Sequence, residues 1–360
     1  MFSQLGDMSI FYILIFLLLL QAIIIPQKNR QGIRAYLIIA FVELQIVSGL
    51  RLPLAGDTEN YTNAFVDISN LSLAEVLNYG YEKGFMFFLY LVSFISSKPQ
   101  SIIFFSSLFL NILILNYIYK KSKAPWLSVI FYVTLMFFFN GMTVLRSMMA
   151  CSILLYSNDY IVKRKLIKFL IILFVASSFH FSTIIYGVVY FLYPMQLKLK
   201  NFVFIATPLI LLSFVILPIL QIVIQIHPRF TSYAEVDFYQ SAYANVLEFL
   251  FNLFIFLFFA YCHKWKLKEI VELEKLYMWL AYLSVVFAFM SINVMIIIRF
   301  VTLCSLIFVV YITNVIKEMP MKRRQRWIML FLFVTITKMV VILTYRPEWF
   351  FGEPFRHLLF

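Results

Sequence analysis

Long apolar runs alternate with short polar segments along the whole chain. Many of these runs approach the roughly 20 residues that an α-helix needs to cross the hydrocarbon core of a bilayer. The pattern predicts an all-α polytopic membrane protein that forms a single domain over residues 1–360. Twelve spans are expected, at residues 9–27, 35–50, 101–119, 126–142, 145–161, 168–182, 183–195, 202–226, 245–262, 277–293, 294–316 and 327–344.

The first run, Ser9 to Ile25, is interpreted as a retained span rather than a signal peptide. Asp7 stands in front of it, where a signal peptide carries a basic segment. It ends at Pro26 and Gln27 without the small-residue cleavage site of a secretory signal.

The composition excludes a water-soluble fold. Hydrophobic residues make up 63% of the chain and charged residues 13%, whereas soluble domains average roughly 25% charged residues. Cys151, Cys262 and Cys304 lie in apolar runs, without a CxxC pair or a nearby histidine cluster. We interpret them as packing residues and expect neither a disulfide nor a metal site.

The net charge of +13 favours a membrane topology over nucleic-acid binding because of where the charges fall. Most of the 30 Lys and Arg residues form short clusters between apolar runs and not one amphipathic face. The positive-inside rule assigns such clusters to the cytoplasm. Segments 51–84 and 227–244 and both termini are then expected in the periplasm. The clusters are Lys28 to Arg34, Lys120 to Lys123, Lys163 to Lys168, Lys198 to Lys200, Lys264 to Lys275 and Lys317 to Arg326.

Two apolar runs lie between most successive basic clusters, but the first interval departs from this pattern. Three runs lie between Arg34 and Lys120, and the middle one, residues 85–97, is short and is followed by Lys98 and Pro99. We interpret it as a re-entrant or outer-leaflet helix. Irregular backbone at membrane depth is tolerated only where protein or water covers it, so this segment predicts a cavity wall. The alternative is a single kinked helix over residues 85–119.

Five arginines fall at the expected outer ends of spans, where the positive-inside rule disfavours them. A guanidinium group presents a planar fork that matches phosphate oxygens, so arginines that converge on one cavity suit a pyrophosphate. The alternative for each is that it reaches a lipid headgroup. The five are Arg51, Arg146, Arg229, Arg299 and Arg346.

Asp57, Glu82 and His180 are the candidate catalytic residues on the same side. Asp57 follows Gly56, which permits a tight turn back to the membrane, and His180 lies at the outer end of a span. Each could take a proton from a sugar hydroxyl, and the sequence does not rank them. The alternatives are solvated loop charges and a packing histidine.

Tyrosines of the outer segments could stack on sugar faces. Tyr61 and Tyr233, together with Arg229 and Arg346, are therefore candidate glycan-binding residues, and Tyr81 and Tyr239 are weighed with them. The alternative is an ordinary interfacial belt of tyrosines.

The order and spacing of these motifs resemble the EpsG family of Wzy-type polysaccharide polymerases over most of the chain. The chain departs from the family pattern after Arg146, where Ser147 stands in place of a frequent Gln, and after His180, where Phe181 replaces a polar residue. These departures leave the charged positions intact. The matching motifs are Arg51-x4-Gly56-Asp57-x3-Tyr61, Glu82-Lys83-Gly84-Phe85, Asn140 to Ala150 around Arg146, Ala176 to Ser182 around His180, and Arg299 at the head of a late span.

The resemblance implies a membrane glycosyltransferase of GT-C-like architecture in a bacterial inner membrane. It would transfer a growing undecaprenyl-pyrophosphate-linked glycan onto the non-reducing end of a lipid-linked repeat unit at the periplasmic face, as in O-antigen, lipopolysaccharide or exopolysaccharide synthesis. The glycosyl-pyrophosphate bond would supply the energy, so no cofactor, metal or nucleotide is expected, and no Walker or Rossmann glycine pattern occurs.

The resemblance also implies roles and partners. Arg146 and Arg299, with Arg51 in support, would bind the donor pyrophosphate. The expected partners are the lipid-linked oligosaccharide, membrane lipid and a chain-length regulator protein, and no nucleic acid.

Three other functions stay open. A flippase or other transporter would gather charges near the membrane midplane, where only Glu43 and Lys338 are expected. A single-transfer ligase of the O-antigen ligase type would use the same chemistry as a polymerase. A membrane acyltransferase would rely on His180, since His227 and His357 are interpreted as loop residues and His263 as cytoplasmic.

Overall fold

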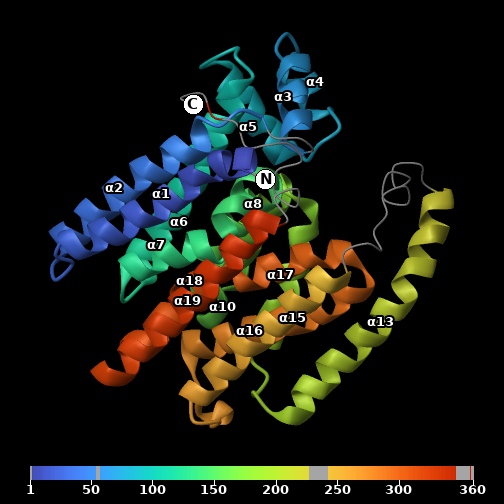
Figure 1. Ribbon diagram of the computed structural model, residues 1–360. Coiled ribbons are helices and arrows are strands. Elements are labelled where there is room, and N and C mark those ends of the chain that lie inside the picture. The colour runs from blue at the N-terminus through green and yellow to red at the C-terminus, as the bar shows by residue number, and fades with distance from the viewer. Residues whose placement is uncertain (1, 54–56, 227–241, 346–356, 358–360) are drawn as a thin grey trace. The chain divides into compact units, whose positions relative to one another are not determined.

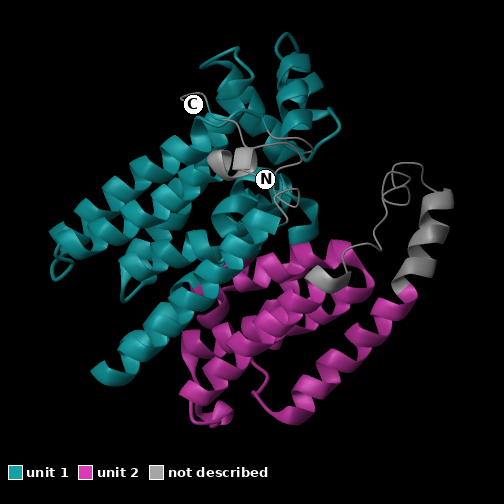
Figure 2. Ribbon diagram, in the orientation of Figure 1, with its two compact units in different colours: residues 1–157, 170–184, 309–360 teal, residues 158–169, 185–308 magenta. Residues whose placement is uncertain are grey.

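The computed structural model describes residues 2–53, 57–226, 242–345 and 357. Within these ranges the regular structure is helical, and the extended pairing is limited to one antiparallel bridge between Arg51 and His357. The chain forms two compact units, which are described separately (Figure 2). The first comprises residues 1–157, 170–184 and 309–360, and the second comprises residues 158–169 and 185–308.

The first unit contains most of the helices that position the candidate site. Its long helices pack α2 on α6 and α1 on α2 and α7, while the short helices α3, α4 and α5 lie together at the end of the unit where α2 ends (Figure 1). The helices are α1 (Phe2–Ile24), α2 (Arg30–Gly49), α3 (Asp57–Asp67), α4 (Leu73–Leu77), α5 (Lys83–Ser93), α6 (Gln100–Lys121), α7 (Pro125–Thr134), α8 (Phe137–Thr143), α9 (Leu145–Leu154), most of α11 (Leu166–Phe179) and of α18 (Phe308–Lys317), and α19 (Met321–Tyr345).

The second unit is built around α16, which packs against α13, α15 and α17. Its helices are α10 (Asn158–Val162), α12 (Gly187–Leu192), α13 (Leu199–Ile226), α15 (Ala242–Cys262), α16 (Glu272–Asn293) and α17 (Ile298–Ser305). Residues 227–241, which include most of the predicted outer segment 227–244, lie outside the described ranges.

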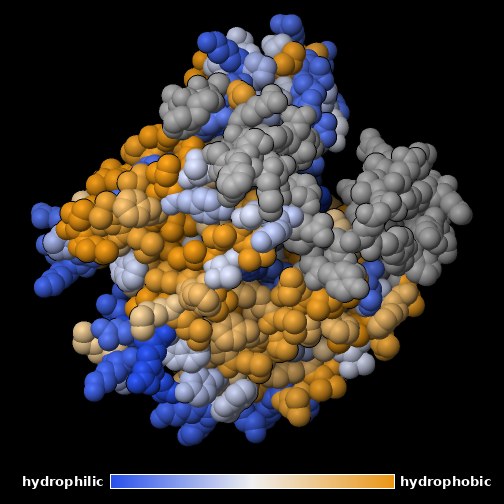
Figure 3. All heavy atoms as spheres, in the orientation of Figure 1, coloured by the Kyte–Doolittle hydropathy of each residue, from blue (hydrophilic) through white to orange (hydrophobic). Residues whose placement is uncertain are grey.

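Five described helices are long and apolar enough to cross a membrane, and seven result if two bent helix pairs each count as one span. The five are α2, α6, residues 245–262 of α15, α16 and α19. The chain is therefore a polytopic helical membrane protein. Apolar side chains cover the outer faces of α1 and α2, with hydrophilic residues at the loop between them (Figure 3). The count of twelve spans and the GT-C-like architecture stay predictions.

The predicted span at 126–142 is not one straight helix. α7 and α8 meet at a bend of 53°, and Met136 between them adopts the left-handed conformation, with φ of 71°. A non-glycine residue rarely takes this conformation, so it marks a real break in the helix. The next helix, α9, begins at Leu145 after a second break at Val144.

The segment predicted at 85–97 is a separate short helix. α5 ends at Ser93, and residues 94–99 separate it from α6, so the alternative of one kinked helix over 85–119 does not occur. Its 11 residues extend roughly 16 Å, about half of a hydrocarbon core.

Buried polar contacts hold α2 and α6 together. The Asn111 side chain donates to Gln45 Oε1 at 3.0 Å, and the Gln45 amide donates to the Phe104 carbonyl at 3.0 Å. Asn111 is almost completely buried. Because lipid offers no hydrogen-bond partners, such contacts fix the helices in one register.

Candidate active site

Glu82 stands at the start of α5, where close packing decides its position. It is the residue directly before the helix, a place that favours a negative charge. A Cβ atom on Gly84 would lie 2.1 Å from Ser178 Oγ and 2.8 Å from the Ser178 carbonyl oxygen. Only glycine therefore lets α5 begin directly against the end of α11, and this contact brings Glu82 next to His180.

We expect Gly84→Ala to lower the free energy of unfolding by about 1 to 3 kcal/mol, since the added methyl group must push α5 away from Ser178. Thermal unfolding of the purified protein in detergent measures the change. Gly80→Ala is the matched control because nothing lies within 4 Å of a Cβ at that position. Equal unfolding temperatures for the two variants would show that the close approach is not required.

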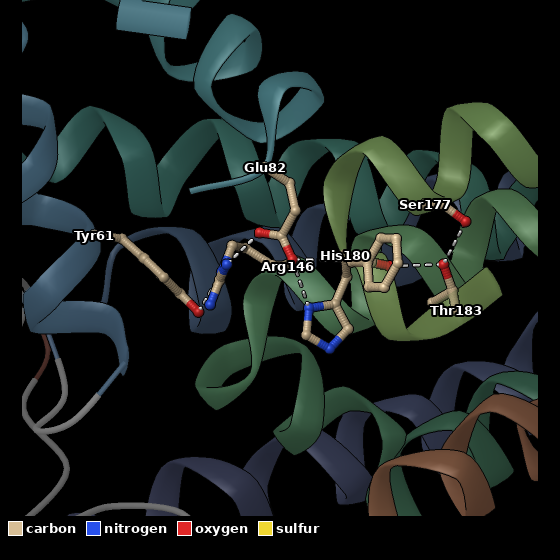
Figure 4. A network of polar contacts seen from close by, with 7 residues as sticks. Tyr61, Glu82, Arg146, Ser177, His180 and Thr183 are labelled. Atoms are coloured by element: carbon tan, nitrogen blue, oxygen red, sulfur yellow. Dashed lines mark hydrogen bonds and ion pairs between the residues drawn. The ribbon is translucent and has the colours of Figure 1, made fainter. Parts of the chain in front are cut away.

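His180 is held by the turn that ends α11. Its backbone N–H donates to the Ala176 carbonyl at 3.1 Å, and the Thr183 hydroxyl donates to the His180 carbonyl at 2.7 Å (Figure 4). The imidazole is buried, with 8% of the residue exposed. The turn thus presents the ring toward Glu82 in a fixed orientation.

Glu82 joins a histidine to an arginine. His180 Nδ1 lies 3.4 Å from Glu82 Oε1, and Oε2 accepts a hydrogen bond from Arg146 Nη1 (Figure 4). The Phe181 N–H also donates to Oε1, at 3.0 Å. One carboxylate therefore spans the end of α11 and the first turn of α9.

The imidazole nitrogen that does not face Glu82 is the candidate base. A carboxylate that faces Nδ1 favours the tautomer with its proton on Nδ1, which leaves the lone pair on Nε2. Both ring nitrogens are buried and lack a hydrogen-bond partner among the described residues, but only Nδ1 faces the carboxylate, at 3.4 Å. This arrangement suits abstraction of a proton from a bound hydroxyl group.

Glu82 itself is a weak base. Burial raises the pKa of its carboxyl group, but the contact with His180, the charge of Arg146 and the Phe181 N–H outweigh burial and lower that pKa to about 2. The carboxylate is therefore ionised at neutral pH and serves to orient its two partners.

The lowered pKa predicts a pH dependence of stability. A depressed carboxyl pKa adds stability that is present above the unfolded value, about 4.3, and is lost as the pH falls toward 2. We expect wild type to exceed Glu82→Gln in unfolding free energy by a constant amount above pH 5, and by a shrinking amount below it. Chemical unfolding at several pH values measures this difference, and a gap that widens below pH 4 would contradict the assignment.

Arg146 is enclosed by aromatic rings. Its guanidinium carbon lies 5.2 Å from the centroid of Tyr61, 4.6 Å from Tyr81 and 5.9 Å from Phe85. Arg146 Nε also donates to the Tyr61 hydroxyl at 2.9 Å. Ring faces attract a cation, so the three side chains, here called the aromatic cage, fix the guanidinium in place.

Comparison with known proteins identifies the family. The EpsG family model matches residues 34–351, which includes every element of this site. The chain belongs to the EpsG family. No curated protein and no solved structure matches it. Membership in the EpsG family supports a membrane glycosyltransferase activity of the polysaccharide-polymerase type.

Asp57 lies beside this EpsG-family site but forms no bond to it. It opens α3 one helical turn before Tyr61, on the same face. Among the described residues it has no hydrogen bond or ion pair, although its charge acts on Tyr61 and Arg146. Its side chain is half-buried.

Arg51 is held by backbone carbonyl groups. It is fully buried and donates to the carbonyls of Ser48, at 2.7 Å, and Met142. Burial lowers its pKa to about 9, which leaves it charged at neutral pH. These contacts tie the end of α2 to α8.

We expect Arg51→Met to destabilise the protein by about 3 kcal/mol, because two buried carbonyl groups lose their donor. The midpoint of thermal unfolding in detergent measures the loss. The exposed Arg34 provides the control, and Arg34→Met should change stability by less than about 0.5 kcal/mol. An unchanged midpoint for Arg51→Met would favour ligand binding over a structural role.

The other predicted arginines and tyrosines belong to the second unit or to residues outside the described ranges. Arg299 is the second residue of α17 in the second unit, and it has no hydrogen bond or ion pair in the part of the chain that the structure describes. Arg229, Tyr233, Tyr239 and Arg346 lie outside the described residues.

The sequence did not predict two features of the EpsG-family site, or the burial of His357 outside that site. The cage role of Tyr81 and Phe85 could have been suspected from their spacing of four residues around Glu82. The packing role of Gly84 had no separate signal. His357, which was interpreted as a loop residue, is 5% exposed, and its Nε2 lies 2.9 Å from the Ile46 carbonyl oxygen.

Proposed function

We propose that this EpsG-family chain is a polysaccharide polymerase. It transfers a growing undecaprenyl-pyrophosphate-linked glycan onto the non-reducing end of a lipid-linked repeat unit, at the periplasmic face of a bacterial inner membrane. The observation that carries the proposal is the carboxylate of Glu82, which holds a histidine base and a caged arginine side by side. Such a pair suits a reaction that removes a proton at one atom while negative charge grows at another.

The acceptor side of the reaction uses His180. The acceptor hydroxyl oxygen attacks the anomeric carbon of the donor glycan, and its proton moves to His180 Nε2. The resulting imidazolium is stabilised by Glu82 through Nδ1. His180 is favoured over Asp57 because Asp57 lacks a residue that orients it, and over Glu82 because a carboxyl group with a pKa of about 2 accepts protons poorly at neutral pH.

The donor side uses Arg146. The bond between the anomeric carbon and the pyrophosphate oxygen breaks, and its electron pair stays on that oxygen. A fixed guanidinium group stabilises this growing charge more than it stabilises the ground state, so it lowers the barrier. Arg299 is proposed as a second pyrophosphate ligand, whereas the buried contacts of Arg51 support a structural role.

Glycan binding and partners complete the proposal. Arg229, Tyr233 and Arg346 are proposed to contact the sugars, and a chain-length regulator protein is a proposed partner. A single-transfer ligase would use the same proton and leaving-group chemistry, so the number of sugar units added decides between ligase and polymerase.

We expect His180→Gln and Arg146→Lys each to lower the rate of chain extension at least about 100-fold, since general-base and charge-stabilising groups contribute factors of that size. Purified protein is given a lipid-linked repeat unit, and product length is read on a gel. The same variants in cells at equal protein level should shorten the glycan ladder.

The matched controls are His263→Gln and Arg34→Lys, which change residues predicted to lie on the cytoplasmic side. Both should give wild-type ladders. A wild-type ladder from His180→Gln and Arg146→Lys would refute the mechanism, and addition of one unit only would assign the chain to the ligases.

A further inference from the structure

The hydroxyl proton of Tyr61 makes no hydrogen bond to a described residue. It accepts the hydrogen bond from Arg146 Nε at 2.9 Å, and none of the described residues accepts a hydrogen bond from it. Tyr61 is 2% exposed. A buried hydroxyl proton without an acceptor is costly, so this proton points to a function at the site.

Arg146 also has an N–H group, on Nη2, that makes no hydrogen bond to a described residue. Its Nη1 is engaged by Glu82 and its Nε by Tyr61, while Nη2 has no partner within the described ranges. In the planar guanidinium group, one N–H of Nη2 runs parallel to the Nε–H. The Tyr61 hydroxyl therefore sits on the edge where Nη2 also donates.

We propose that Tyr61 is a further catalytic residue, whose hydroxyl donates a hydrogen bond to the same pyrophosphate oxygen that Arg146 binds through Nη2. This inference rests on the proposed function. It names the hydrogen-bond donors that bind the pyrophosphate leaving group. Two donors that converge on one oxygen form an oxyanion site, in which charge is stabilised without reorganisation.

The surroundings of Tyr61 keep it in the donor form. Burial raises the pKa of its hydroxyl, the charge of Arg146 lowers it and that of Asp57 raises it, with a net rise. The hydroxyl is therefore protonated at neutral pH. Its ring is fixed by edge contacts with Tyr81, at 5.6 Å between centroids, and Phe85, at 5.0 Å.

The same contacts argue against sugar stacking by Tyr61. A stacking platform needs an open ring face, but this ring is buried within the aromatic cage. What remains for a ligand is the hydroxyl edge, which lies beside Arg146 (Figure 4). A small anionic group fits that edge better than the face of a sugar does.

The test is binding of inorganic pyrophosphate to the detergent-purified full chain, measured by calorimetry. Tyr61→Phe keeps the ring and removes only the hydroxyl. We expect the dissociation constant to rise about 10- to 100-fold, as for the loss of one hydrogen bond to a charged group. Tyr132→Phe is the matched control, since it removes a buried hydroxyl group from α7, outside the site, and it should bind as wild type does.

Arg146→Lys separates failure of this inference from failure of the proposed function. Weaker binding in Arg146→Lys together with wild-type binding in Tyr61→Phe overturns only the role of Tyr61. Wild-type binding in both variants overturns the pyrophosphate site itself.

A second variant covers the case in which Tyr61→Phe unfolds at a lower temperature. Incorporation of 3-fluorotyrosine at position 61 keeps the hydroxyl and makes it a stronger donor. We expect pyrophosphate binding equal to or tighter than that of wild type. A loss of 10-fold or more with the fluorinated residue would overturn the inference.

Discussion

The carboxylate of Glu82 contacts both Arg146 and His180. The positions of the helices around the site depend on these two contacts. One oxygen faces the imidazole of His180 and the other binds Arg146. A guanidinium group in a partly buried position is costly unless a counter-charge and good hydrogen bonds accompany it. Glu82 supplies the counter-charge to Arg146, and the Phe181 N–H and its place before α5 stabilise Glu82 in turn.

This constraint explains irregular features of the neighbouring helices. α5 has to begin where its first residues touch α11, which requires Gly84. α9 has to begin where Arg146 falls in its first turn, which follows from the breaks at Met136 and Val144. The aromatic cage then closes around the guanidinium from α3 and α5. The breaks before α9 and the close contact at Gly84 thus bring Arg146 and His180 within reach of Glu82.

The sequence predicted the class of fold well because bilayer thickness imposes long apolar runs. It also selected Glu82, Arg146 and His180, since charges at the outer ends of spans stand out against apolar surroundings. It could not predict that Arg51 turns inward to two carbonyl groups, because an arginine at a helix end has the same sequence signal whether it binds backbone or ligand. The bend at Met136 carries neither proline nor glycine, so only the packed structure reveals it.

The shared carboxylate also couples the two halves of the proposed reaction. Before transfer, Glu82 balances the charge of Arg146 and faces Nδ1 of His180. In the proposed transfer, His180 takes the acceptor proton, so the group of three side chains gains one positive charge as the leaving pyrophosphate gains negative charge. Glu82 is then drawn toward the imidazolium, so it neutralises Arg146 less and leaves more of the guanidinium charge for the departing oxygen. In a partly buried site, where charges interact more strongly than in water, base and leaving-group stabilisation would therefore reinforce each other through one side chain.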